Sequence, residues 1–181
     1  FWIGSHGTDH HVGTRALRPL EEFEGGNDIV TVLLDVTSRF GHPLFVDSAS
    51  SGPWAQALLE ELIPRLERDY RLDPRGRFLS GHAAGGWAAL WLQLTHPETF
   101  AGAWALAPWP ASFESWFGTN LYAVENAFVR PDGEPYRYGV WPDGTPTEPA
   151  RTTWRRERVV GAGGLFGSFE WAFSPPDAEG R

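Results

Sequence analysis

The segment from Arg77 to Trp87 has the residue types and spacing of a site for nucleophilic catalysis. A short apolar run leads into Ser80, glycines follow at positions 81, 85 and 86, and an apolar helical pattern comes next. A strand that turns sharply into a helix through Gly-x-Ser-x-Gly holds its serine at a strained apex, the nucleophile elbow. Here Ala83 stands where the pattern has serine. The sequence therefore predicts the frame of an elbow with a methyl group in the nucleophile position.

Backbone groups near this apex remain candidates for binding an oxyanion. Such a site uses the N–H of the residue after the nucleophile and an N–H from the loop after a neighbouring strand, close to a helix N-terminus. Ala84 follows the apex, and Ser5 and His6 lie in the glycine-bounded segment 4–7. We expect backbone donors from these three residues. The remaining elbow residues are expected to let the strand and helix approach closely or to line the pocket wall: Gly81, His82, Gly85 and Gly86.

Apolar runs and helical patterns alternate in the first part of the chain. Helices are expected over residues 53–70, capped by Ser51 or Gly52 and kinked at Pro64, and over residues 84–95, which are apolar nearly all round and should be buried. This alternation is typical of an α/β fold with a mostly parallel sheet. Four short runs are the expected strands: 1–4, 29–36, 77–81 and 101–107.

The character of the chain changes after Pro108. Prolines are frequent there, and two Asp-Gly turn signals occur, at Asp132 and Asp143. We expect neither a long periodic element nor an internal repeat in this part. Residues 1–110 are therefore predicted to form the core of the fold, and residues 111–181 a loop-rich cap or tail of the same domain.

The composition argues against several kinds of binding partner and site. The 181 residues include 23 acidic and 15 basic ones, which gives a formal net charge of -8. Because the acidic residues are spread along the chain, a surface that binds nucleic acid is not expected. No apolar run approaches the roughly 18 residues of a membrane span. The chain has no cysteine, so a thiolate metal site is excluded. The histidines near position 10 are clustered in one segment, and no further group of metal-ligating residues elsewhere in the sequence would complete a site with them. We therefore expect neither a metal nor a cofactor. Localisation and oligomeric state stay open.

The elbow and its flanks resemble the putative-esterase family of α/β hydrolases, which includes enterochelin-esterase-like and esterase-D-like enzymes. Members resemble this chain in a Gly-His-Ser-x-Gly-Gly elbow, here residues 81–86, and in a preceding helix with Glu-Glu-Leu-Ile-Pro, here residues 60–64. The resemblance covers residues 29 to 110. It implies ester hydrolysis by a serine, an acid and a histidine, in that order along the chain.

The chain departs from the family pattern at its catalytic groups. Ala83 replaces the nucleophile, no histidine follows His96, and no later strand is predicted to carry the acid. Because the members of a triad act as a unit, any one of these losses would be severe. We therefore predict a catalytically inactive protein in which the nucleophile and the C-terminal part of the family pattern are missing. The absence of methionine also indicates an excerpt or a processed product.

The resemblance further implies a truncated α/β-hydrolase sheet. Strand 29–36 is expected at one edge, beside strand 1–4, which in turn neighbours strand 77–81. Missing outer strands would expose a long sheet edge unless the proline-rich tail covers it.

Two alternatives remain open, and both involve a small-molecule ester or carbohydrate. The chain is a non-catalytic module that binds a carbohydrate or an aryl ester, or it is an excerpt or mutant of an active esterase. The first alternative relies on aromatic faces that pack on sugars and rings. Its candidate residues are Trp104, Trp109, Trp116 and Trp141.

Overall fold

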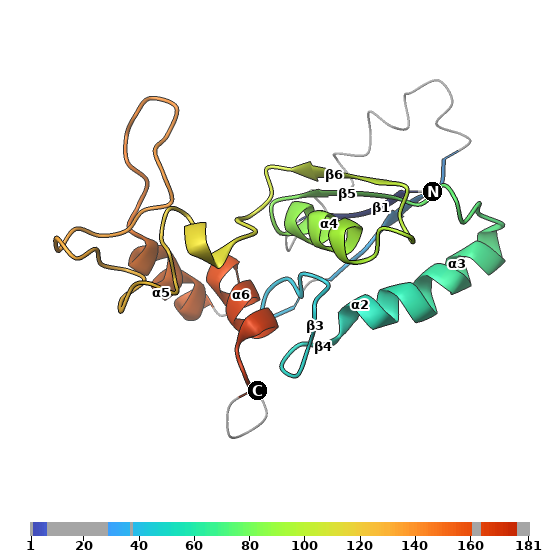
Figure 1. The fold of residues 1–181 in the computed structure, drawn as a ribbon, viewed down its shortest axis with the longest axis horizontal. Helices are drawn as coiled ribbons and strands as arrows, with labels where there is room; N and C mark the ends of the chain where they lie inside the picture. The colour runs from blue at the N-terminus through green and yellow to red at the C-terminus, as the bar shows by residue number, and fades with distance from the viewer. Residues whose placement is uncertain (1, 7–28, 37, 161–163, 177–181) are drawn as a thin grey trace.

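Four parallel strands form the central sheet of the computed structural model (Figure 1). The structure describes residues 2–6, 29–36, 38–160 and 164–176. The order across the sheet is β2-β1-β5-β6, so the predicted α/β fold and the predicted neighbours of the first three strands are confirmed. The strands are β1 (Trp2–His6), β2 (Thr31–Leu33), β5 (Phe78–His82) and β6 (Gly102–Leu106).

Two of the strands differ in extent from the prediction. Only Thr31–Leu33 of the expected strand 29–36 belongs to the sheet. β1 continues to His6, beyond the expected end of the strand at residue 4 and into the glycine-bounded segment 4–7. The backbone of β1 pairs with β5 along its whole length, so that Ser5 lies opposite Gly81 and His6 opposite His82. Tertiary pairing thus overrides the local turn propensity.

One helical stretch runs from Trp54 to Tyr70 in three parts: α2 (Trp54–Gln56), the π-helix η2 (Ala57–Leu62) and α3 (Ile63–Tyr70). The expected disturbance at Pro64 takes the form of η2. A proline donates no backbone hydrogen bond and crowds the carbonyl four residues earlier. In the wider turn just before it, the N–H of Ile63 donates to the carbonyl of Leu58, five residues back. The chain therefore bypasses Pro64 without ending the helix.

The cap of this helix comes from a residue that the sequence did not indicate. Neither Ser51 nor Gly52 caps it, because the N-cap position is Pro53, which makes no side-chain bond. Instead Asp47 Oδ1 accepts hydrogen bonds from the N–H of Ala55, at 2.8 Å, and of Gln56, at 3.2 Å. A small hairpin, β3 (Asp47–Ser48) and β4 (Gly52–Pro53), folds the aspartate back onto the start of the helix.

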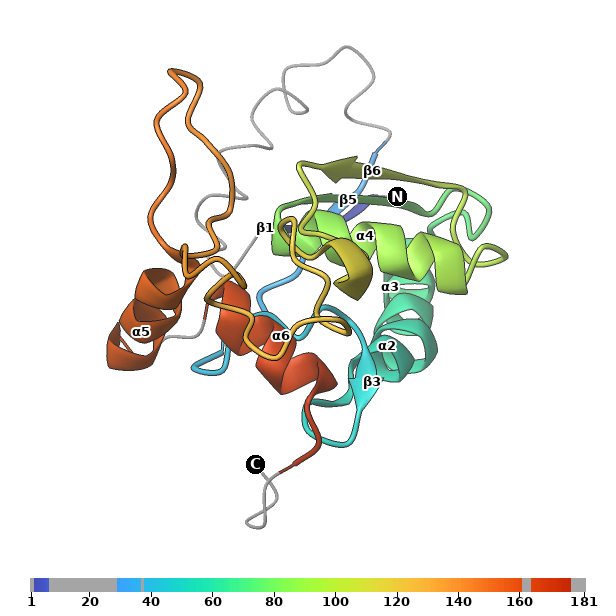
Figure 2. The same cartoon turned by 60° about the vertical axis from the view of Figure 1, so that its left-hand side comes forward.

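The helix α4 (Ala84–Thr95) begins directly after β5 and has the predicted bounds. It covers the sheet face that carries Leu79 and Ala103, together with η2 and α3, and Figures 1 and 2 show these helices on one side of the sheet. Burial all round is not observed, since Trp91 is 36% and Leu94 69% exposed. The buried residues of this first core are Val36, Phe45, Ala55, Leu58, Ile63, Leu79, Ala88, Ala89, Leu92 and Phe100.

Residues after Pro108 contain helical structure that the sequence did not indicate. A short 3-10 turn, η3 (Phe113–Ser115), is followed by the helices α5 (Ala150–Val160) and α6 (Leu165–Phe173). Glu157 on α5 accepts a hydrogen bond from the N–H of Gly167 at 3.1 Å, at the start of α6, and burial raises the pKa of this carboxyl. This part is thus more than a loop-rich tail.

A second, largely aromatic core joins these helices to the rest of the chain. Its members come from residues 44–46, from the start of α4 and from the segment after Pro108. Ring centroids of Trp87 and Phe169 are 6.1 Å apart, and those of Trp116 and Phe166 are 5.2 Å apart. The buried residues are Leu44, Val46, Ala84, Trp87, Trp116, Ala150, Phe166, Phe169 and Ala172.

The two Asp-Gly signals form matching turns, drawn in orange in Figure 1. Residues 129–135 and 140–146 both read Val-x-Pro-Asp-Gly-x-Pro, which is an internal repeat and corrects the expectation of none. In each turn the residue before proline makes two backbone hydrogen bonds. Its carbonyl accepts from the N–H of the glycine, and its N–H donates to the carbonyl of the residue after the glycine. Bridges between Val129 and Pro135 and between Val140 and Pro146 close the two turns in the same way.

Candidate functional site

The apex of the predicted elbow has a strained backbone. Ala83 lies between the end of β5 and the start of α4 with φ of 53° and ψ of -114°. An L-residue with a side chain rarely adopts this conformation, which costs on the order of 1–3 kcal/mol and persists only when the surroundings impose it. A sharp, strained turn from strand to helix is the geometry by which an elbow presents its nucleophile. The backbone has this shape although the side chain is a methyl group.

Backbone hydrogen bonds from three directions hold the apex. The N–H of Ala83 donates to the carbonyl of Leu106, at the end of β6, over 3.1 Å. The carbonyl of Ala83 accepts from the N–H of Trp87 at 2.9 Å, in the first turn of α4, and from the N–H of Trp109 at 3.3 Å. Because both polar groups of the residue are bonded to neighbouring elements, the strained conformation is fixed from outside. The contribution of Trp109 had no signal in the sequence.

The glycines of the elbow permit a very close approach of strand and helix. A Cβ atom added to Gly81 would lie 2.1 Å from the carbonyl carbon of Gly85, and one added to Gly86 would lie 2.9 Å from the carbonyl oxygen of Leu106. Atoms without a bond between them do not come so close. A side chain at Gly81 or Gly86 would therefore clash with the neighbouring backbone, and Gly85 is buried as well.

The other polar residues of the strand do not replace the missing hydroxyl. Ser80 lies three residues before the apex, opposite Trp104 of β6, and is half-buried within the sheet. His82 is exposed at the end of β5, and its place in a pocket wall stays a prediction. It immediately precedes Ala83, so it belongs to the elbow itself.

The candidate oxyanion donors lie at neighbouring ends of elements. Ala84 is buried in the first turn of α4, where backbone N–H groups lack partners within the helix and the helix dipole favours negative charge. Ser5 and His6 end β1, beside the last two residues of β5. Parallel pairing therefore brings the three candidates to the same end of the sheet. Their role as donors stays a prediction.

The described histidine side chains are not placed to act as the base of a triad. His96 follows α4, about 18 Å along the helix axis from the apex. His42 is fully buried, its Nδ1 accepts from the N–H of Leu44 at 2.9 Å, and burial lowers its pKa to about 3. The backbone N–H of His42 donates to Oγ of Ser168 at 2.8 Å, which ties residue 42 to α6. His42 is a structural residue that the sequence did not reveal, and residues 7–28, with His10 and His11, lie outside the described part.

The four tryptophans proposed for ligand binding are not brought together. Trp116 is 6% exposed within the aromatic core, and Trp109 packs at its margin against Phe169. Trp104 lies on β6 beside Phe78, whereas Trp141 belongs to the second repeated turn. Trp109 is bonded through its N–H to the carbonyl of Ala83 at the apex.

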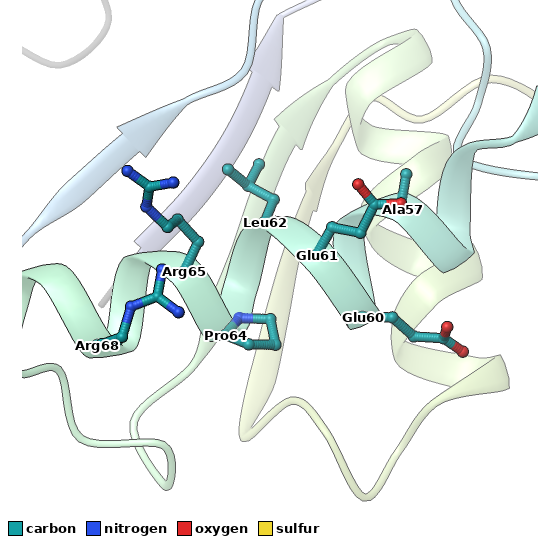
Figure 3. A pocket seen from close by; sticks show the side chains of 7 residues that line it. All are labelled: Ala57, Glu60, Glu61, Leu62, Pro64, Arg65 and Arg68. Atoms are coloured by element: carbon teal, nitrogen blue, oxygen red, sulfur yellow. The ribbon is translucent and has the colours of Figure 1, made fainter.

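A hollow of about 610 Å³ lies on the outer side of η2 and α3 and is unrelated to the elbow (Figure 3). Its two glutamates and two arginines are spread along one helical stretch and do not converge on a common point. Three of the charged groups have partners within the same helical stretch: Glu60 accepts from Gln56 at 3.1 Å, and Arg65 and Arg68 both pair with Asp69. The lining residues are Ala57, Glu60, Glu61, Leu62, Pro64, Arg65 and Arg68.

Within the described ranges, no three His, Asp or Glu residues are grouped as a metal ion would need. In the same ranges, no helix has both the length and the apolar character that crossing a bilayer requires. What the elbow can offer chemically is a rigid apex beside a helix N-terminus.

Comparisons with known proteins found one family whose model matches the sequence and a solved structure with a similar fold. Residues 36–159 match the model of a family described as "Putative esterase", which spans the elbow and more than half of the chain. A solved structure described as a ferulic acid esterase matches with a TM-score of 0.46 and 16% identity, over 74% of this chain and 50% of that chain. This chain thus spans half the length of that protein. No curated protein matches the sequence.

Proposed function

Since the chain belongs to the putative esterase family, we propose that it is a member that does not hydrolyse esters. The observation that carries this proposal is the Ala83 methyl group at the strained apex. Acyl transfer by this family's chemistry needs a side-chain oxygen that attacks the ester carbonyl and a histidine that accepts its proton. A methyl group forms no such bond.

The distribution of histidine supports the same conclusion. All six histidines of the sequence precede residue 97, whereas the order implied by the family resemblance places the histidine after the nucleophile and the acid. His96 is the only one after the apex, and it is separated from the apex by the length of α4. Within these 181 residues, neither the hydroxyl at the apex nor a histidine in that order is present. Restoring the hydroxyl alone would leave these residues without such a histidine.

The test is hydrolysis of p-nitrophenyl acetate by the purified chain. We expect the rate to equal that of a heat-denatured sample at the same concentration. Saturable turnover well above that control, abolished by a serine-directed phosphonate, would refute the proposal. Phosphonate sensitivity is needed because exposed side chains also react slowly with activated esters.

A second candidate function is ligand binding without hydrolysis. Its support is Trp109, a half-buried tryptophan whose backbone is bonded to the carbonyl of Ala83, so that an aromatic residue borders the elbow. Carbohydrates and aryl esters are the ligand classes that pack on such a ring. Tryptophan fluorescence titrated with a panel of both classes tests it: we expect a saturable change that Trp109→Ala removes. A flat titration with every compound would refute this function and leave the first proposal standing.

A further inference from the structure

The two tryptophans that bond the apex carbonyl both pack against one aromatic residue of α6. The N–H of Trp87 donates to the carbonyl of Ala83 at 2.9 Å, and the N–H of Trp109 donates to it at 3.3 Å. The ring centroid of Phe169 lies 6.1 Å from that of Trp87 and 5.8 Å from that of Trp109. At these separations aromatic rings attract each other. Phe169 therefore contacts both side chains whose backbones hold the apex.

The same three aromatic residues join separate segments at the base of the elbow. Nε1 of Trp87 donates to the carbonyl of Pro110 at 3.2 Å, directly after Trp109 in the chain. Trp87 and Phe169 are buried in the second core, and Trp109 packs against that core. The first turn of α4, the segment after β6 and the middle of α6 therefore meet in one cluster. Because a protein interior is close-packed, displacing one of these rings displaces its neighbours.

Hydrogen bonds on another side fix the position of α6. Oγ of Ser168 accepts the N–H of His42 at 2.8 Å, and the indole N–H of Trp171 donates to the carbonyl of Ser50 at 3.1 Å. These bonds tie the helix to the segment that surrounds β3, and α6 lies beside this strand (Figure 2). A helix held in this way is a firm support for the rings that pack on it.

We propose that Phe169 is a positioning residue that keeps the elbow in its strained shape. While α6 is docked, its ring holds Trp87 and Trp109 where their N–H groups bond the carbonyl of Ala83, and the apex relaxes when α6 leaves.

The strain at the apex explains why such a support is needed. A φ of 53° at an alanine is less favourable than an ordinary conformation by a factor of about five or more, so the surroundings must impose it. The bond from Trp87 belongs to α4 itself, whereas the bond from Trp109 comes from outside the helix. Loosening Trp109 should therefore release the apex. This inference holds whichever function proposed above is correct, because the strain is a property of the fold.

A double-mutant cycle measured by urea denaturation tests this coupling. In the wild type, Ala83→Gly should lower the ratio of unfolded to folded protein about five-fold, because glycine tolerates the conformation of the apex. In the Phe169→Leu background the apex is already relaxed, so the same substitution should change this ratio by less than about two-fold.

The matched control is Phe166→Leu. Phe166 and Phe169 are both 7% exposed, on the same helix and in the same core. The ring contacts of Phe166 are with Trp116, Phe128 and Tyr138. In the Phe166→Leu background, Ala83→Gly should keep its effect of about five-fold.

Three outcomes of the cycle would overturn the proposal. An undiminished effect of Ala83→Gly in Phe169→Leu would show that the apex is strained without this ring. An effect lost equally in Phe166→Leu would show that any damage to the core suffices. No effect in the wild type would show that there is no strain to hold.

Hydrogen exchange of the wild type tests the coupling without a substitution, and it decides the question if Phe169→Leu does not fold. Undocking of α6 frees the N–H of Trp109, so at low urea this group should exchange at least as fast as the most protected N–H of α6. Slower exchange at Trp109 than at every N–H of α6 would show that the apex is held without the helix.

Discussion

Lowering the pH should destabilise this protein through His42. The imidazole is fully buried, and burial lowers its pKa from 6.5 to about 3. In the unfolded chain the same imidazole is exposed to water and takes up a proton at its ordinary pKa, about 6.5. Between these two values the unfolded state binds a proton that the folded state does not. The free energy of unfolding is therefore unaffected by His42 above the unfolded pKa and falls as the pH decreases below it.

The size of the effect follows from the difference between the two pKa values. Each pH unit below the unfolded pKa is worth about 1.4 kcal/mol, so a change from about pH 7.5 to about pH 5 costs about 2 kcal/mol through this residue. His42→Asn removes the titration and keeps an acceptor for the N–H of Leu44, because its Oδ1 replaces the imidazole Nδ1. The variant loses packing against Phe45 at every pH. Only its pH dependence is informative.

Urea denaturation followed by tryptophan fluorescence at both pH values measures this dependence. The wild type should lose about 2 kcal/mol more than His42→Asn on acidification. The matched control is His96→Asn, at a partly exposed imidazole after α4, which leaves His42 in place and should therefore keep the loss that His42 causes. Equal losses for the wild type and His42→Asn would refute the reasoning. An NMR titration of the wild-type imidazole tests it without a substitution, since a midpoint above about pH 5 would contradict the burial effect.

Substitutions at three further positions test the elbow and the junction between α5 and α6 by urea denaturation. Ala83→Gly should raise the free energy of unfolding by about 1 kcal/mol, because glycine tolerates a φ of 53°, and an unchanged or lower stability would show that the apex is not strained. Gly81→Ala should cost about 3 kcal/mol or prevent folding, because its Cβ would overlap the carbonyl of Gly85; a loss below about 1 kcal/mol would contradict the close approach. Glu157→Ala should cost about 1 kcal/mol by leaving the N–H of Gly167 without its acceptor, whereas Glu157→Gln should cost less, and equal losses would refute the bond.

The residues around the elbow could be predicted from sequence because several local signals agree there. A strand of apolar residues, glycines at fixed spacing and an uninterrupted apolar helix each indicate the same turn, and α4 has the predicted bounds. The order of the first three strands was available only through the family resemblance. Local patterns do not specify which strands become neighbours.

The features that sequence did not reveal depend on distant contacts. Asp47 caps α2 only because a hairpin folds it back, and His42 is buried only because α6 packs over it. The segment Leu165–Phe173 contains a glycine and a serine amid bulky aromatic residues, which is a poor helical pattern, and its helix is stabilised by packing in the aromatic core. The buried extent of α4 was overestimated, because a helix that is apolar on every side gives no indication of which side packs against the sheet.

Turnover of Ala83→Ser compared with the wild type tests the central claim most directly. The substitution returns a hydroxyl to the strained apex but supplies no histidine to accept its proton, and removal of a single triad member already costs on the order of a million-fold in rate in a well-studied serine protease. We predict that both proteins hydrolyse p-nitrophenyl acetate no faster than their heat-denatured controls and that Ala83→Ser gains no stoichiometric phosphonate adduct. Saturable hydrolysis by Ala83→Ser, blocked by the phosphonate, would contradict the claim that the elbow persists here without its catalytic machinery.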